Sequence, residues 1–147
     1  MKKIFFLMLI LTITAFFSES MNAQTEQQMI EACTRVAGAD ANMLNHYVIN
    51  LPAVRPGERP QPFRVVIGLR AGNQYRVTIC VGDDSPGEAI VRVTNGPRTE
   101  GTNEAEGVIH QNFNFNCNST GPHTFIVTSK DGREVSAVLI VSHVRTL

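Results

Sequence analysis

Residues 63–81, FRVVIGLRAGNQYRVTICV, contain two alternating segments on either side of a turn. Apolar side chains occupy every second position from Phe63 to Leu69 and again from Tyr75 to Val81. A repeat of two is typical of a β-strand with one buried face, and the residues at 71–73, Ala-Gly-Asn, have the composition of a turn. The segment therefore predicts two strands.

The same alternation recurs on both sides of this segment. It predicts further strands at residues 45–51, 89–94, 108–117, 123–129 and 135–144, with Asp131-Gly132 as a tight turn before the last one. Seven strands at regular spacing indicate an all-β fold, an antiparallel β-sandwich that is either jelly-roll or immunoglobulin-like. The last strand is apolar on both faces, so we expect its outer face to be covered too.

The first 44 residues follow another pattern. Lys2 and Lys3 precede an apolar run at residues 4–17, and small residues end at Ala23. This order predicts a signal peptide over residues 1–23, cleaved after Ala23, because a run of about 14 apolar residues is too short to span a membrane. Residues 24–37 then show helical spacing, with Gly38 as a stop. We expect a helix and linker over 24–44, the helix covering the sheet, and a sandwich domain over 45–147.

Charge and hydropathy exclude two classes of partner. Lys2 and Lys3 account for two of the 13 basic residues and Glu19 for one of the 13 acidic residues, so residues 24–147 carry 11 basic and 12 acidic side chains, a net charge of −1. Such a chain lacks the basic field that nucleic-acid binding requires. No later stretch is apolar and long enough to span a bilayer. The sequence predicts an exported protein, periplasmic or extracellular, of unspecified oligomeric state.

Three cysteines remain after export: Cys33, Cys80 and Cys117. In an oxidising compartment one pair is expected to form a disulfide, leaving one thiol. By phase Cys80 points outward from its strand and Cys117 inward, so a bond between these two would cross the sheet. Cys33, on a helix covering the outer face, is an equally good partner for Cys80, and the pairing stays open.

Two segments resemble a family of secreted modules. Leu69–Val77 and Phe115–Val127 each place a glycine turn before an alternating strand, as in bacterial pre-peptidase C-terminal jelly-roll domains. The resemblance extends over residues 63–144 and implies a non-catalytic accessory of a secreted enzyme. The acidic strand of that family is replaced here by Ala89–Val93. Gly121–His143 also resembles the final hairpin of type IX secretion sorting domains.

Catalytic and metal-binding patterns are sparse. There is no Gly-x-Ser-x-Gly sequence, and Cys117 with His110 or His123 is interpreted as a core or disulfide residue rather than a thiol–imidazole pair, so we expect no enzyme. No cofactor is expected apart from a candidate calcium site at Asp83, Asp84 and Glu88, whose carboxylates share one turn.

The candidate binding surface is the stretch from Asn95 to Gly107, expected to be a long loop, because long ordered loops tend to carry function. A row of asparagine amides on the 112–117 strand is a second candidate, suited to a glycan or a peptide strand. The predicted binding residues are Asn95, Arg98, Glu100, Asn103, Glu104, Glu106, Asn112, Asn114 and Asn116.

The sequence thus predicts an exported, non-catalytic binding or accessory module that recognises a protein or polysaccharide at the cell exterior. One alternative is a structural subunit that assembles through a sheet edge. Another is a small secreted hydrolase, which would require a nucleophile and a base within reach of each other.

Overall fold

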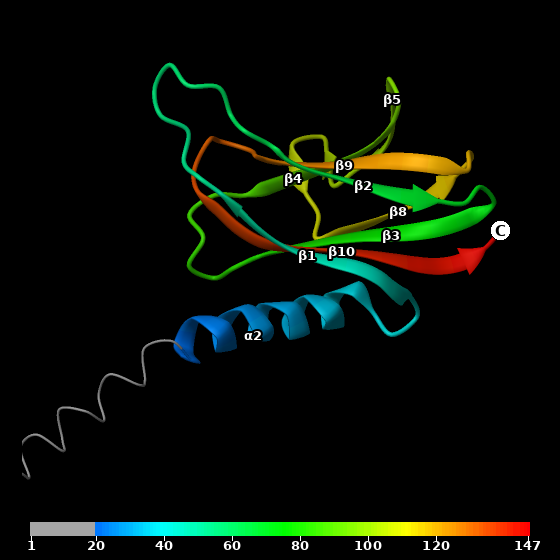
Figure 1. Cartoon of the computed structure of the whole chain (residues 1–147), viewed down its shortest axis with the longest axis horizontal. Coiled ribbons are helices and arrows are strands. Elements are labelled where there is room, and N and C mark those ends of the chain that lie inside the picture. Colours follow the sequence, from blue (N-terminus) through cyan, green and yellow to red (C-terminus); the bar gives the residue numbers. More distant parts are fainter. Residues whose placement is uncertain (1–19) are drawn as a thin grey trace, which may run out of the picture.

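A computed structural model describes residues 20–147, with side chains from residue 25 onward. Two antiparallel four-stranded sheets face each other as a sandwich, and helix α2 lies against the outer surface of one of them (Figure 1). Among the described residues, no helix has the length and hydropathy to cross a membrane. The predicted signal peptide lies outside the described residues, except that residues 20–23 form the start of α2.

The two sheets are named A and B. Sheet A contains, in spatial order, β1 (Asn42–Leu51), β10 (Val135–Thr146), β3 (Asn73–Val81) and β8 (Asn112–Cys117). Sheet B contains β2 (Phe63–Leu69), β9 (Gly121–Ser129), β4 (Ala89–Asn95) and β5 (Arg98–Thr102). The short strands β6 (Glu104–Ala105) and β7 (Val108–Ile109) form a separate hairpin.

The strand pairing is that of one long hairpin wrapped into a sandwich. Strand β1 pairs with β10, β2 with β9, β3 with β8, and β4 with β5, all antiparallel. Two further ladders, β10 with β3 and β4 with β9, join these pairs into sheets. This is a jelly roll, so the structure decides between the two predicted sandwich types. The turn before Asn73 consequently connects strands of opposite sheets.

Strand β10 is buried on both faces, as its sequence predicts. Ala137, Leu139 and Val141 enter the core between the sheets. Val138 and Ile140 point to the opposite side and are fully covered by helix α2 (Ser20–Ala37). The expectation that the N-terminal helix covers the last strand is confirmed.

A disulfide attaches the helix to sheet A. Cys33 and Cys80 are bonded, with their Cα atoms 5.6 Å apart. Cys33 packs with Ala37 against the β10 side chains, so the bond lies inside the helix–sheet contact. Cys117 is a free, buried thiol. The open choice of cysteine pairing is resolved in favour of the helix–strand bond.

Polar contacts at the C-terminal end of the helix reinforce this attachment. Gly38 adopts a φ of +89°, a conformation that glycine adopts without strain and that ends a helix. The Arg76 guanidinium donates to the Ala37 carbonyl at 2.8 Å and pairs with both Asp40 carboxylate oxygens at 2.8 and 3.0 Å. Hydrogen bonding to Arg76 lowers the pKa of Asp40 below its usual 3.8. The turn after the helix is thereby fixed to β3.

The region of residues 95–117 departs from the sequence-based prediction. The expected loop from Asn95 to Gly107 contains β5 and β6, and the expected strand at 108–117 is interrupted between β7 and β8. Strand β5 has the sequence RTEGT, which shows no apolar alternation because the strand lies at the edge of sheet B and its outer positions are solvated. A prediction based on alternating apolar residues therefore does not detect β5 or its pairing with β4.

We predict that replacing both disulfide cysteines, Cys33→Ala with Cys80→Ala, lowers the free energy of unfolding by about 4 kcal/mol, because the bond closes a loop of 47 residues. Guanidinium titration followed by circular dichroism measures this loss. Reductant should destabilise the unaltered protein to a similar extent and leave the variant unchanged. A loss below about 1 kcal/mol would show that packing alone holds the helix.

Candidate functional site

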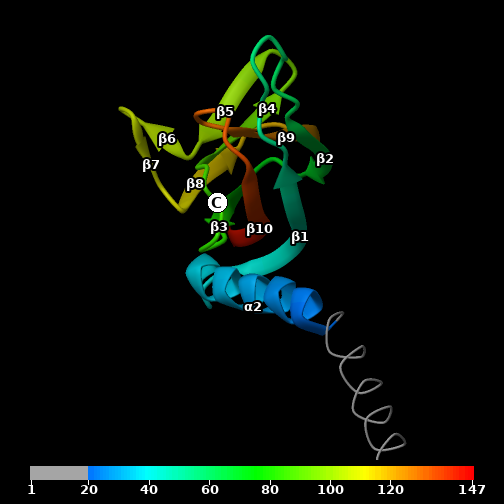
Figure 2. The ribbon, with the colours of Figure 1, turned by 90° about the vertical axis from the view of Figure 1, so that its left-hand side faces the viewer.

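The β6–β7 hairpin projects from the body of the sandwich (Figure 2). Its two central residues, Glu106 and Gly107, have φ values of 53° and 79°, which defines a tight turn with positive φ at both positions. Val108 beside this turn is 55% exposed. The hairpin is an ordered, convex feature rather than the long loop expected from the sequence.

Asn103 holds the base of this hairpin. Its side-chain oxygen accepts the Val91 N–H at 2.8 Å, and its amide nitrogen donates to the carbonyls of Ala89 (3.1 Å) and His110 (3.2 Å). The side chain thus continues the hydrogen bonding of the β4 edge beyond the end of β5. Asn103 is only 1% exposed, so its prediction as a surface binding residue is corrected: it is buried because it satisfies backbone groups.

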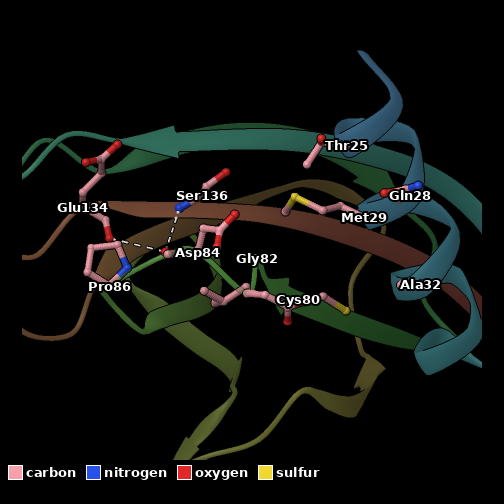
Figure 3. Close-up of a pocket in the computed structure, with 13 residues that line it drawn as sticks. Thr25, Gln28, Met29, Ala32, Cys80, Gly82, Asp84, Pro86, Glu134 and Ser136 are labelled. Atoms are coloured by element: carbon pink, nitrogen blue, oxygen red, sulfur yellow. Dashed lines mark hydrogen bonds between the residues drawn. The ribbon is translucent and has the colours of Figure 1, made fainter. Parts of the chain in front are cut away.

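A groove of about 650 Å³ opens between helix α2 and the turn after β3 (Figure 3). On the helix side Gln28, Met29 and Ala32 face it, and Gly82 and Asp84 of the turn lie opposite. The remaining residues that line it are Thr25, Cys80, Val81, Asp83, Ser85, Pro86, Glu134 and Ser136. Met29, Ala32 and Cys80 contribute apolar lining, and the carboxylates of Asp83, Asp84 and Glu134 lie along one side.

The turn that forms this carboxylate side is hydrogen-bonded along the start of β10. Gly82 N–H donates to Ser136 O at 2.9 Å, and Gly87 N–H donates to Glu134 O at 2.9 Å. The Ser85 hydroxyl accepts the Ser136 N–H at 3.0 Å. With its backbone bonded in this way, the turn presents its side chains from a fixed position.

Lys130 contacts both the β6–β7 hairpin and Glu88, the residue that follows the Gly82–Gly87 turn. Its ammonium donates to the Gly107 carbonyl at 3.2 Å and lies 3.7 Å from the Glu88 carboxylate. Glu88 is therefore paired with a lysine, whereas Asp83 and Asp84 are exposed. Among the described residues these three carboxylates do not converge as ligands for one ion. The calcium site stays a prediction without geometric support.

The asparagine row on β8 is engaged within the protein. Asn112 donates to the Val36 carbonyl at 3.2 Å, Asn114 accepts from Arg76 at 2.9 Å, and Asn116 accepts from Gln74 at 3.0 Å. All three amides lie on the outer face of sheet A, and Asn112 contacts helix α2 there. Each has one internal partner, which reduces the free hydrogen-bonding array that the sequence suggested.

Other predicted binding residues lie in separate surroundings. Asn95 is partly buried and donates a short hydrogen bond to the Ser119 hydroxyl. Arg98 and Glu106 are exposed, and Glu104 is half-buried. Glu100 is the second correction: its side chain is 8% exposed and points inward from β5 toward His123, so it is not part of an outer surface.

Glu100, Cys117 and His123 form a buried cluster between the two sheets. His123 Nε2 lies 3.1 Å from Glu100 Oε2 and 3.7 Å from Cys117 Sγ. His123 is fully buried and Cys117 is 1% exposed. Glu100 is on β5 and Cys117 on β8, which are edge strands of the two sheets, and His123 is on the interior strand β9 of sheet B.

The cluster is not arranged for nucleophilic catalysis. Burial raises the pKa of the Cys117 thiol. The backbone contact at Ser119 lowers this pKa in part, and the nearby Glu100 charge raises it further. A catalytic cysteine needs the opposite shift together with access to substrate. His110, the other imidazole considered for this pair, is exposed and lies outside the cluster.

Sequence reasoning considered Cys117 with His123 but did not connect either residue with Glu100, and it did not find the groove. Glu100 precedes Gly101, where a Cβ atom would collide with the Phe113 ring. This close approach of β5 to β8 brings Glu100 beside Cys117. A glycine within a polar segment was the only local signal for it.

Comparisons with known proteins show no family. No family model matches the chain, and no curated protein matches it. Among solved structures, a lysozyme inhibitor of Aeromonas hydrophila named PliG, described as a periplasmic inhibitor of g-type lysozyme, aligns with a TM-score of 0.46 and 18% identity. The alignment covers 72% of this chain and 88% of that one. No function is carried over from a likeness at this level.

We predict that Asn103→Ala lowers the free energy of unfolding by about 3 kcal/mol, because it leaves a buried N–H and two carbonyls without their partner. Amide exchange at Val91 should accelerate with it. The matched control is Asn118→Ala, at an exposed asparagine, with an expected change within about 0.5 kcal/mol. Equal effects of the two substitutions would contradict the bridging role of Asn103.

Proposed function

We propose that this protein is an exported, non-catalytic module that binds another protein by receiving one of its basic side chains in the groove between α2 and the Gly82–Gly87 turn. The observation that carries the proposal is the combination of apolar lining residues with unpaired carboxylates in a concave site. Concave sites of this kind, with a few fixed polar groups, are the usual binding sites of proteins.

The charge of the groove selects the occupant. Asp83, Asp84 and Glu134 line it, and no basic side chain is among its described lining residues. No carboxylate of the three forms a salt bridge within the described part of the chain. A cation that enters this groove therefore meets negative charge that no internal partner has neutralised.

The apolar lining residues select the shape of the occupant. Met29 and Ala32 of the helix offer apolar surface next to the Cys33–Cys80 disulfide. A lysine or arginine side chain matches this arrangement, because its methylene stem packs on apolar surface while its charged head remains with the carboxylates. The flexible thioether of Met29 allows this surface to adapt to the entering chain.

Export is supported by two independent features. The N-terminal 23 residues have the composition of a signal peptide. The disulfide that attaches the helix to sheet A is of the structural kind that persists in oxidising compartments. A periplasmic or extracellular location follows as part of the proposal, and a protein partner in that location is the one that the groove fits.

The proposal is tested with two blocked pentapeptides that differ only in their central residue, lysine or glutamate, flanked by leucines. The ¹⁵N-labelled protein, recovered after export of the full chain, is titrated with each and followed by NMR. We expect saturable shifts at the amides of Gly82, Asp84 and Ser136 with the lysine peptide alone. Asp83→Asn combined with Asp84→Asn should weaken binding by about tenfold or more, since hydrogen bonds to charged groups contribute roughly 1.5–3 kcal/mol.

The control combines Glu58→Gln with Glu106→Gln, which removes the same charge from exposed positions outside the groove. This variant should bind the lysine peptide as the unaltered protein does. Equal shifts with the glutamate peptide, or shifts that avoid the groove, would overturn the proposal.

A further inference from the structure

The buried cluster of Glu100, Cys117 and His123 contains three different ligand atoms that face one another. The carboxylate oxygen, the thiol sulfur and His123 Nε2 all lie within 4.8 Å of one another. Four zinc ligands at the usual bond lengths of about 2.0–2.3 Å and tetrahedral angles imply nitrogen–oxygen and nitrogen–sulfur separations of about 3.4 and about 3.6 Å. The observed separations are 3.1 and 3.7 Å.

The orientation of His123 directs Nε2 into the cluster. Its Nδ1 lies 3.0 Å from the Gly121 carbonyl, which can only accept a hydrogen bond, so Nδ1 carries the proton. Nε2, the other ring nitrogen, faces Glu100 and Cys117. A backbone carbonyl that holds the second ring nitrogen in this way is a common support for a metal-binding histidine.

Glu100 provides a second observation at the cluster. Its Oε2 is buried and receives no directed hydrogen bond, although Nε2 of His123 is within ion-pair distance. A carboxylate oxygen and an imidazole lone pair at 3.1 Å repel each other unless a positive charge lies between them. Burying such a carboxylate without compensation is costly.

We propose that Glu100, Cys117 and His123 bind a divalent zinc ion. One thiolate, one imidazole and one carboxylate form a mixed set that suits zinc, whereas calcium and magnesium prefer oxygen ligands alone. Binding displaces the thiol proton of Cys117 to solvent, so the ion enters a site with two negative ligands. Three protein ligands leave one tetrahedral position for a water molecule or a neighbouring carbonyl.

The position of the site indicates a structural role for the ion. Glu100 lies on β5 at the edge of sheet B, and Cys117 lies on β8 at the edge of sheet A. Apart from the helix disulfide, no covalent link is found among the described residues. A zinc ion at this point would join the two sheets at an open side of the sandwich and stabilise the native state by linkage.

The test uses the exported protein after dialysis against EDTA, with zinc chloride as the probe in calorimetry and thermal unfolding. We expect one zinc ion per chain and a rise in the melting temperature. Cobalt should give visible d–d bands together with a thiolate-to-cobalt charge-transfer band. Glu100→Gln should weaken zinc binding by at least about tenfold, the smallest effect seen when metal-site contacts are removed.

The matched controls are Glu106→Gln and His110→Gln, which make the same kinds of change at exposed positions near the hairpin. Both should bind zinc as the unaltered protein does. Should Glu100→Gln fail to fold, the alkylation rate of Cys117 in the unaltered protein replaces it, and zinc should slow that reaction. The proposal would be overturned by any of three results: the absence of a charge-transfer band, the absence of thiol protection, or zinc binding that Glu100→Gln does not affect. The positive charge between Glu100 and His123 would then be a shared proton.

Discussion

The burial of β10 on both faces is the constraint on which the rest of the structure depends. Its inner face fills the sandwich core, and Val138 and Ile140 on its outer face are covered by helix α2. A sheet strand with two apolar faces requires two packed layers. The disulfide at Cys33 and the Arg76 contacts with the helix end both secure this second layer. Helix α2 forms one wall of the groove, so the groove depends on the position of the helix.

The wrapped hairpin of the jelly roll explains why candidate sites form where strand edges meet. The ladder of β4 with β5 is the closed end of the long hairpin, and the return toward β8 carries the inserted β6–β7 hairpin. This path brings Glu100 on one sheet edge beside Cys117 on the other and beside His123 on β9. The proximity of these residues is a property of topology and not of local sequence.

The strand pattern, the covering helix and the inward phase of Cys117 could all be predicted from the chain, because each depends on a local period of hydrophobicity. What could not be predicted depends on contacts between distant segments. Strand β5 is a polar edge strand, so its pairing leaves no apolar period. Asparagine is a residue typical of loops, yet Asn103 is buried because its side chain is hydrogen-bonded to backbone groups of β4 that are distant in sequence. Glu100 faces inward because Gly101 allows β5 to approach Phe113.

The most direct test of the two-layer account is native-state hydrogen exchange of helix α2 and strand β10. Amides of Ala32–Ala37 and of Val138–Val141 should exchange with one common opening free energy, equal to the global free energy of unfolding, because the helix and the outer face of β10 are buried against each other. The account is contradicted if the helix amides exchange at a much lower free energy while β10 remains protected, since the helix would then be a dispensable cover.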